Sequence, residues 1–187
     1  VASVSAAIKG PSPQTTIIGT VSLSRTSGTP QSGTWSGTFT FPSGASDGTY
    51  TVEDTATDTS GNSAKQTDGT VILDRTPPTV SIVSITPAIQ EPGGTVTVAA
   101  SASDTSSGIS GLEVRDATVG GSPVAMSFVS GSTDPGQSSN WQGTIGAALP
   151  TGSHTVEVVG KDKAVPPNSM IVTGSFSAMY KITFDQT

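Results

Sequence analysis

The sequence predicts an all-β protein made of two domains, and three observations support this. Charged residues make up only 12% of the 187 residues, whereas glycine (22) and proline (13) are abundant, so helix formers are scarce. Short runs of alternating apolar and polar residues follow one another, separated by turn residues. The second half of the chain also repeats motifs of the first half, which favours two domains, each large enough to bury a core.

The two halves meet at residues 74–78 (DRTPP). Neither Pro77 nor Pro78 can donate a backbone hydrogen bond. The backbone of a residue that precedes a proline also avoids the helical φ/ψ region and prefers an extended conformation. One strand must therefore end before Pro77, and another can begin after Pro78. We predict domains at residues 1–75 and 76–187.

Alternating runs predict the strands of the first half. The turn residues between them include the polar stretch 24–33 and the pair Gly61-Asn62, which tolerates the positive φ of a tight turn. The predicted strands lie at residues 4–8, 17–23, 35–41, 50–56 and 69–73.

The second half contains seven such runs. The last of them is longer than a usual strand, so we expect a bend or a bulge at its only interruption, Gly174. The predicted strands lie at residues 79–85, 95–102, 111–116, 124–130, 141–145, 154–160 and 170–184.

The two halves align over several motifs. No helical segment separates the runs within either copy, and turns recur about every 8 to 12 residues, which favours a Greek-key β-sandwich for each half. The matched segments are residues 35–39 (WSGTF) with 141–145 (WQGTI), residues 48–53 (GTYTVE) with 152–157 (GSHTVE), Asp58 with Asp162, and Asn62 with Asn168.

The alignment also reveals a deficit in the first half. Two predicted strands, residues 79–85 and 95–102, precede Trp141, and they have no counterparts before Trp35. We therefore expect the first sandwich to lack its N-terminal strands. A strand added from a neighbouring copy, or from an upstream part of the same polypeptide, would complete it.

Three motifs resemble the bacterial and archaeal immunoglobulin-like repeats of large cell-surface proteins. They are the pattern GTYTVEDTATDTSGN at residues 48–62, the joint DRTPPTV at residues 74–80, and DTSSGI at residues 104–109. The resemblance implies two tandem immunoglobulin-like sandwiches located outside the cell, at its surface. It also implies a non-catalytic structural role as a spacer, stalk or lattice unit of a surface-layer, filament or repeat-adhesin protein, with neighbouring repeats or other copies as partners.

Composition excludes several classes of partner and site. The net charge is −6 with no basic patch, so we expect no nucleic-acid binding. The apolar runs are too short to span a bilayer, so we expect no membrane insertion of this segment. Cysteine is absent, which excludes disulfides, thiolate metal sites and cysteine nucleophiles.

No set of residues predicts catalysis. Residues 44–48 (GASDG) fit the Gly-x-Ser-x-Gly elbow of serine hydrolases, but that elbow requires a helix after it, and here a strand is expected. The single histidine, His154, takes the place of Tyr50 in the alignment, and we interpret it as a packed or partly exposed strand residue. Trp35 and Trp141 read as core residues. The alternative is an adhesive or carbohydrate-binding module accessory to a secreted enzyme, with the tryptophans as its platform.

Four aspartates lie in turns or at the joint, where carboxylates together with backbone carbonyls can bind a hard cation such as Ca²⁺. The alternative is that each carboxylate caps its own turn. The candidate calcium ligands are Asp58, Asp74, Asp104 and Asp162.

Overall fold

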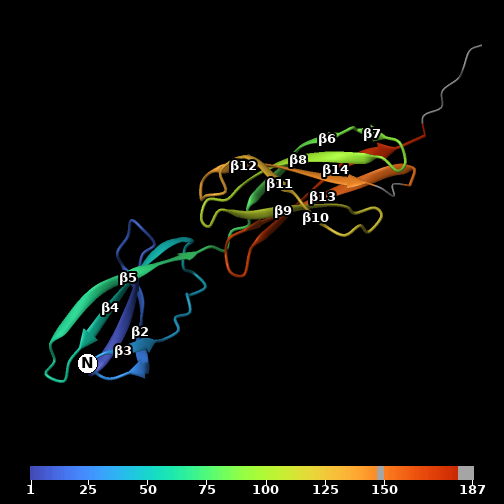
Figure 1. Ribbon diagram of the computed structural model, residues 1–187. Helices are drawn as coiled ribbons and strands as arrows, with labels where there is room; N and C mark the ends of the chain where they lie inside the picture. Colours follow the sequence, from blue (N-terminus) through green and yellow to red (C-terminus); the bar gives the residue numbers. More distant parts are fainter. Residues whose placement is uncertain (147–149, 181–187) are drawn as a thin grey trace, which may run out of the picture. The chain divides into compact units, whose positions relative to one another are not determined.

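The computed structural model describes residues 1–146 and 150–180, and Figure 1 shows strands, turns and loops throughout them. The chain divides into two units, Val1–Asp74 and Arg75–Thr187. Each unit has its own sheets, and each is described by itself.

The first unit is one antiparallel sheet of five strands. The strand order is β3-β2-β1-β4-β5, so the chain's first strand lies at the centre of the sheet. The strands are β1 (Ser3–Lys9), β2 (Ile17–Gly28), β3 (Gly33–Ser36), β4 (Gly48–Thr57) and β5 (Ser63–Leu73).

The second unit is a sandwich of two sheets. One sheet has the order β10-β9-β13-β14-β7 and the other the order β11-β12-β8-β6. The strands are β6 (Thr79–Thr86), β7 (Ile89–Gln90), β8 (Thr95–Ser103), β9 (Ile109–Asp116), β10 (Val124–Ala125), β11 (Ser127–Gly131), β12 (Ser138–Gly146), β13 (Gly152–Asp162) and β14 (Ser169–Ala178).

The core of the second unit is formed by the inward faces of its two sheets. Strand β8 alternates strictly between buried and partly exposed residues, as expected of a strand with one face against a core. The largest buried side chains include Val96, Val98, Leu112, Val156 and Val158.

The strand orders of the two units correspond. The order β2-β1-β4-β5 of the first unit repeats the order β10-β9-β13-β14 of the second, and the pair β2-β3 repeats β11-β12. Ala6 lies opposite Asp54 as Val114 lies opposite Val158. Strands β6 and β8 have no counterpart among residues 1–74, all of which the structure describes. The all-β immunoglobulin-like prediction is confirmed.

Two predicted boundaries beside β3 were wrong, and the strand predicted at residues 69–73 begins earlier, at Ser63. The stretch 24–33 is not all turn, because β2 continues to Gly28 and pairs with β3. The predicted strand 35–41 ends at Ser36. Its counterpart β12 is paired on both edges, with β11 and β8, whereas β3 pairs only with β2, so residues 37–41 have no second strand to continue along.

The predicted bulge at Gly174 was also wrong. Strands β13 and β14 pair without a register shift from Gly152 to Lys161, and Gly174 lies opposite Val156 within that ladder. A Cβ atom at Gly174 would lie 2.7 Å from Ile85 Cδ1, so the glycine permits close packing of the two sheets. The strand ends at Ala178, and residues 181–184 of the predicted run lie outside the described residues.

Candidate functional site

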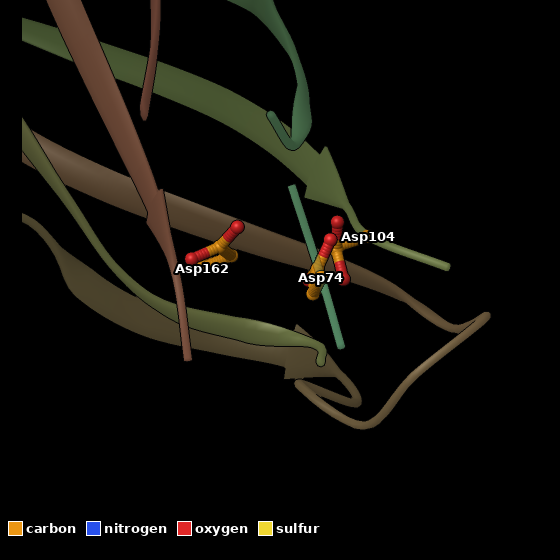
Figure 2. Close-up of side chains that lie close together, drawn as sticks. All are labelled: Asp74, Asp104 and Asp162. Atoms are coloured by element: carbon orange, nitrogen blue, oxygen red, sulfur yellow. The ribbon is translucent and has the colours of Figure 1, made fainter. Parts of the chain in front are cut away.

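Three of the four predicted calcium ligands are brought together. One carboxylate oxygen from each of Asp74, Asp104 and Asp162 lies within 4.8 Å of the others, and Figure 2 shows their side chains. We call these residues the three-aspartate group. Asp104 directly follows β8, Asp162 ends β13, and Asp74 directly precedes the second unit.

The sheet registers explain why two of these residues lie at one end of the second unit. Thr79, at the start of β6, pairs with Ser103, so the chain enters the unit beside Asp104. Asp162 pairs with Ile109, which follows the turn that Asp104 begins. The end of β8 and the end of β13 therefore meet at the edge where the unit begins.

Asp104 is buried, and one of its oxygens organises the turn that follows it. Its Oδ1 accepts hydrogen bonds from the backbone N–H groups of Ser106 (3.0 Å), Ser107 (2.8 Å) and Gly108 (2.8 Å). Gly108 has a φ of +83°, which the turn requires and which glycine adopts without strain. The carboxylate is thus held in place by the backbone of its own loop.

Asp162 and Asp58 cap their turns in the same way. Asp162 Oδ1 accepts from the backbone N–H of Asn168 (2.8 Å), and its Oδ2 accepts from the amide Nδ2 of Asn168 (2.7 Å). Asp58 Oδ1 accepts from the backbone N–H of Asn62 (2.9 Å), and its Oδ2 accepts from Asn62 Nδ2 (3.0 Å). The Asp–Asn match seen in the sequence is therefore one repeated turn.

Asp58 differs from Asp162 in its surroundings. The three-aspartate group does not include it, and its side chain is exposed. The hydrogen bonds from Asn62, the side-chain amide first, lower the pKa of the Asp58 carboxyl below its usual range. The structure therefore assigns Asp58 to turn capping.

The three-aspartate group has the chemistry of a hard-cation site. Three carboxylates bring negative charge to one place, and a carboxylate oxygen can accept a hydrogen bond on one lone pair and bind a cation with another. Ca²⁺ takes oxygen ligands, including backbone carbonyls and water, and tolerates irregular geometry. A divalent ion of this kind would offset the mutual repulsion of the carboxylates.

The Gly-x-Ser-x-Gly motif has no catalytic setting. Residues 44–47 lie in a loop, and Gly48 begins the strand β4 where a nucleophile elbow would begin a helix. The carbonyl of Ser46 accepts a hydrogen bond from the Tyr50 hydroxyl at 2.7 Å, so the loop serves the packing of Tyr50.

A buried polar pair escaped the sequence reasoning. His154 Nδ1 lies 2.6 Å from Asp116 Oδ2, and both side chains are buried. The carbonyl of Pro150 can only accept, so Nε2 of His154, at 2.8 Å, carries a hydrogen. The sequence signal was weak, because Asp116 ends a strand and resembles a turn residue. Asp116 lines a cavity of about 320 Å³ whose lining does not include His154, and the hydrogen bond between the two side chains joins β9 to β13.

The two tryptophans differ in burial. Trp141 is 8% exposed, and its Nε1 donates to Ser139 Oγ at 2.8 Å. That hydroxyl in turn donates to the carbonyl of Ala102 at 3.0 Å, which ties β12 to β8. Trp35 is partly exposed. Trp141 is therefore a core residue and offers no sugar platform.

A comparison with protein families agrees with the fold of the second unit. The family described as "Bacterial Ig domain" matches residues 78–158. A solved structure titled "tetra-tandem repeat in extending region of large adhesion protein" is similar with 22% identity and a TM-score of 0.38, over 94% of this chain and 42% of that one. No curated protein matches the sequence. Among residues 1–146 and 150–180, no helix is long and apolar enough to cross a membrane. Residues 78–158, which lie in the second unit, therefore match a bacterial immunoglobulin-like domain.

Proposed function

We propose that this chain is a non-catalytic structural segment of an extracellular cell-surface protein. It serves as a spacer or stalk, or as a unit of a lattice or filament, within a surface-layer, filament or repeat-adhesin protein. The observation that carries the proposal is the repetition of one strand order in two units joined by a short segment that contains Pro77 and Pro78.

Repetition of this kind suits a structural role. Each unit is organised by the same turn, Asp58 with Asn62 and Asp162 with Asn168, and by the same Trp-x-Gly motif. A glycine is needed in that motif, because a Cβ atom at Gly143 would lie 2.7 Å from Val114 Cγ1. The repeated residues therefore maintain the fold, which is what an array of spacers requires.

The alternative is an adhesive or carbohydrate-binding module accessory to a secreted enzyme. Such a module presents aromatic rings to solvent beside polar groups. Trp141 is buried in the core, which supports the structural role, whereas Trp35 is partly exposed and keeps the alternative testable in the first unit.

We further propose that the three-aspartate group binds Ca²⁺ and thereby stabilises the second unit. Asp104 and Asp162 come from two different sheets, so an ion held by both would join the ends of β8 and β13. Stabilisation would follow because the ion binds the folded chain and not the unfolded one.

The test of the surface role uses cells of the source organism. Antibodies raised against the 187-residue chain should label intact cells, and brief protease treatment of those cells should remove the label. Labelling that requires permeabilised cells would contradict the proposal. A glycan array probed with the same chain separates the alternative, because saturable binding that Trp35→Ala abolishes would favour a carbohydrate-binding module.

A further inference from the structure

The outer strands of the second unit's two sheets are protected against pairing with another chain. An outer strand presents backbone N–H and C=O groups to solvent, and proteins usually limit such pairing with short strands, bulges, charges or prolines. Strands β7 and β10 have two residues each. The ladders of β6 and β11 each contain a register shift, at Ile82/Ser84 and at Phe128/Ser130.

Strand β14 lacks this protection along most of its length. Its ten residues, Ser169–Ala178, include no charge and no proline, and it pairs with β13 without a register shift. On its other side, β7 pairs only with Ser177 and Ala178. Among the described residues, the rest of that side belongs to no ladder. We call this side of residues 169–175 the β14 edge.

The contact with β7 shows which backbone groups lie on the β14 edge. The N–H of Ser177 donates to the carbonyl of Ala88 at 2.9 Å, on the side away from β13. Successive residues of a strand point their N–H and C=O groups to opposite sides, so the other odd-numbered residues of β14 also point away from β13. The groups on the edge therefore belong to Ser169, Ile171, Thr173 and Ser175.

Apolar side chains are exposed beside these backbone groups. Met170 is 39% exposed and Ile171 is 55% exposed, and the two lie on opposite faces of β14. Strand β6 runs along the same side of the sandwich, because a Cβ atom at Gly174 would lie 2.7 Å from Ile85 Cδ1. Val83, at the register shift of β6, is 63% exposed. A strand that paired along the β14 edge would remove both backbone groups and apolar surface from water.

A second copy of β14 matches this edge. The free groups run from Ser169 to Ser175, so their midpoint is Val172. With two copies antiparallel and Val172 opposite its counterpart, Ser169 faces Ser175 and Ile171 faces Thr173. All four residues then exchange backbone hydrogen bonds in pairs, and the contacts with β7 remain. Such a contact, in which one surface meets itself about a two-fold axis, is the commonest type in homo-oligomers.

The side chains on the inward face fit this register. Met170 of one copy lies opposite Gly174 of the other, where no side chain competes with it for space. Within its own unit Gly174 lies opposite Val156, as its equivalent in the first unit, Gly69, lies opposite Val52. The glycine that permits close packing of β6 thus also leaves room for a methionine from a neighbouring strand.

The outward face and the charge distribution fit it too. Ile171 lies opposite Thr173, and pairs of β-branched residues across neighbouring strands are favourable. Two chains that each carry a net charge of −6 repel each other, but β14 brings no charge to the contact. The other outer strands of the second unit are protected, so on a second copy of that unit β14 is the strand left to pair.

We propose that two copies of this chain associate through the β14 edge, antiparallel about a two-fold axis at Val172. The contact joins the sheets of two second units into one. It involves residues 169–175 of each copy, whereas a standard interface has about 20–30 residues on each side, so the association is weak. Weak contacts suit an array in which neighbouring copies are held at high local concentration. The proposal deepens the lattice or filament role given above and rests on it only for its setting at the cell surface.

Amide hydrogen exchange of the full 187-residue chain, measured up to millimolar concentration, tests the contact. Exchange should slow with rising concentration at every second amide of the edge, those of residues 169, 171, 173 and 175. The amides of residues 170, 172 and 174 already face β13 and should not change. Sedimentation velocity of the same samples should show a dimer that grows in parallel.

Cysteine substitution tests the register, because the chain contains no cysteine. Val172→Cys places two thiols opposite each other at a pair that is not hydrogen-bonded, where Cα atoms are about 4.5 Å apart and a disulfide can form. Under oxidising conditions this variant should form a covalent dimer at least about ten-fold faster than Val129→Cys. Val129 is the matched control, a 59% exposed valine on the outer strand β11. Thr173→Cys should also react slowly, because its counterpart lies two residues away along the strand.

A proline on the edge should abolish the contact. Thr173→Pro removes an N–H that points to the partner and leaves the ladder with β13, which uses the even-numbered residues. Ile171→Lys keeps every backbone group and brings two like charges together across the axis, so it should weaken the dimer even where the proline variant does not fold. The matched control is Val124→Lys, at an exposed valine on β10, which should dimerise like the unaltered chain.

Three results would overturn the proposal. The first is unchanged exchange of the odd-numbered amides of the β14 edge up to millimolar concentration. The second is concentration-dependent protection of another strand in place of β14. The third is equal rates of covalent dimer formation by Val172→Cys and Val129→Cys. Each of these results leaves the surface role standing, since that role depends on the labelling of intact cells.

Discussion

Tyr50 and His154 each donate a side-chain hydrogen bond to the backbone carbonyl four residues earlier in the chain. The Tyr50 hydroxyl lies 2.7 Å from the carbonyl oxygen of Ser46, and His154 Nε2 lies 2.8 Å from that of Pro150. Both bonds fix the entry of the chain into a central strand, as the tyrosine corner does in other immunoglobulin-like folds. An imidazole has a second polar nitrogen that a phenol lacks, and in the second unit Asp116 satisfies it.

The residue on the neighbouring strand that accompanies His154 differs from the one that accompanies Tyr50, and this difference leads to a double-mutant prediction. Asp116 lies opposite Val156, and Ile8 takes the same place opposite Val52. His154→Tyr should destabilise the second unit by about 3–5 kcal/mol, because it removes the hydrogen-bond partner of the buried Asp116 side chain. Adding Asp116→Ile reproduces the arrangement of Tyr50 and Ile8 and should recover at least half of that loss. Calorimetric unfolding of the four chains measures the coupling, and additive effects would contradict the exchange.

The two equivalent glycines should respond oppositely to a methyl group. Gly174→Ala should destabilise the second unit by about 1–3 kcal/mol, because the new Cβ would press on Ile85 and Ile82. Gly69→Ala should be neutral or should stabilise the first unit by up to about 1 kcal/mol, because its surroundings are open and glycine costs strand stability. Urea unfolding followed by hydrogen exchange assigns each change to its unit. Equal losses at both positions would mean that Gly69 is covered.

The two Asp–Asn turns should differ in their sensitivity because one is buried and the other is exposed. Asp162→Ala removes a buried carboxylate that accepts three hydrogen bonds. The donors are the backbone N–H of Ala164, the backbone N–H of Asn168 and the side-chain amide of Asn168. We expect the free energy of unfolding to fall by about 2–4 kcal/mol. Asp58→Ala removes similar bonds that water can replace and should have a small effect. Thermal melts of the two variants test this, and a loss at Asp58 as large as that at Asp162 would contradict it.

Calcium should raise the melting temperature of the second unit if the three-aspartate group binds it. Scanning calorimetry with calcium and with a chelator measures the shift, which grows with the free ion concentration. Asp104→Asn keeps an oxygen for its turn but removes the charge, and should abolish the shift. Asp58→Asn is the matched control outside the group and should keep it. Identical traces of the unaltered chain with calcium and with chelator would assign all four aspartates to turn capping.

Neighbouring carboxyls on β4 should give opposite pH dependence. Lys9 and then Lys65 hydrogen-bond Glu53, at 2.7 Å and 3.2 Å, and lower its pKa, so its stabilisation is present above the unfolded pKa and is lost as pH falls through the folded one. The pKa of Asp54 is raised, so its unfavourable contribution is present at neutral pH and is relieved as pH falls through the folded pKa towards the unfolded value.

The corresponding variants separate the two effects. Glu53→Gln should make the first unit less sensitive to acid. Asp54→Asn should stabilise the first unit at neutral pH and have little effect at about pH 3, where the Asp54 carboxyl is mostly protonated in both the folded and the unfolded chain. Urea unfolding of the first unit between these pH values is the measurement. A destabilising effect of Asp54→Asn at neutral pH would show that the carboxylate already has a partner.

The sequence predicted best where a residue's role is local. Alternation placed most strands, and Asp58, Asn62, Asp162 and Asn168 aligned because a turn depends on residues that are close in the chain. Pairing between distant strands was less visible. The strand at Trp35 stops at Ser36 because a partner is missing, and alternation alone cannot register that absence.

Long-range polar contacts were also beyond the sequence. Asp116 and His154 are separated by 38 residues, and only the pairing of β9 with β13 brings them together. Gly174 was read as a bend because a glycine in a strand has two common uses, and the close approach of β6 is evident only in three dimensions. The sequence offered four aspartates as candidate calcium ligands. Strand pairing at the ends of β8 and β13 brings Asp104 and Asp162 together with Asp74, whereas Asp58 lies outside this group.

The first and last long strands of the second unit run in the same direction, with a mechanical consequence. Val80 of β6 lies near Gly160, opposite the start of β14, and Ile85 lies near Gly174 further along it. Tension on the chain would therefore pull β6 and β14 along their own axes in opposite senses. The hydrogen bonds of β6 with β8, and of β14 with β13, would be loaded together in shear instead of breaking one after another. Resistance of this kind appears as slow forced unfolding, which depends on the barrier and not on the equilibrium stability of the unit.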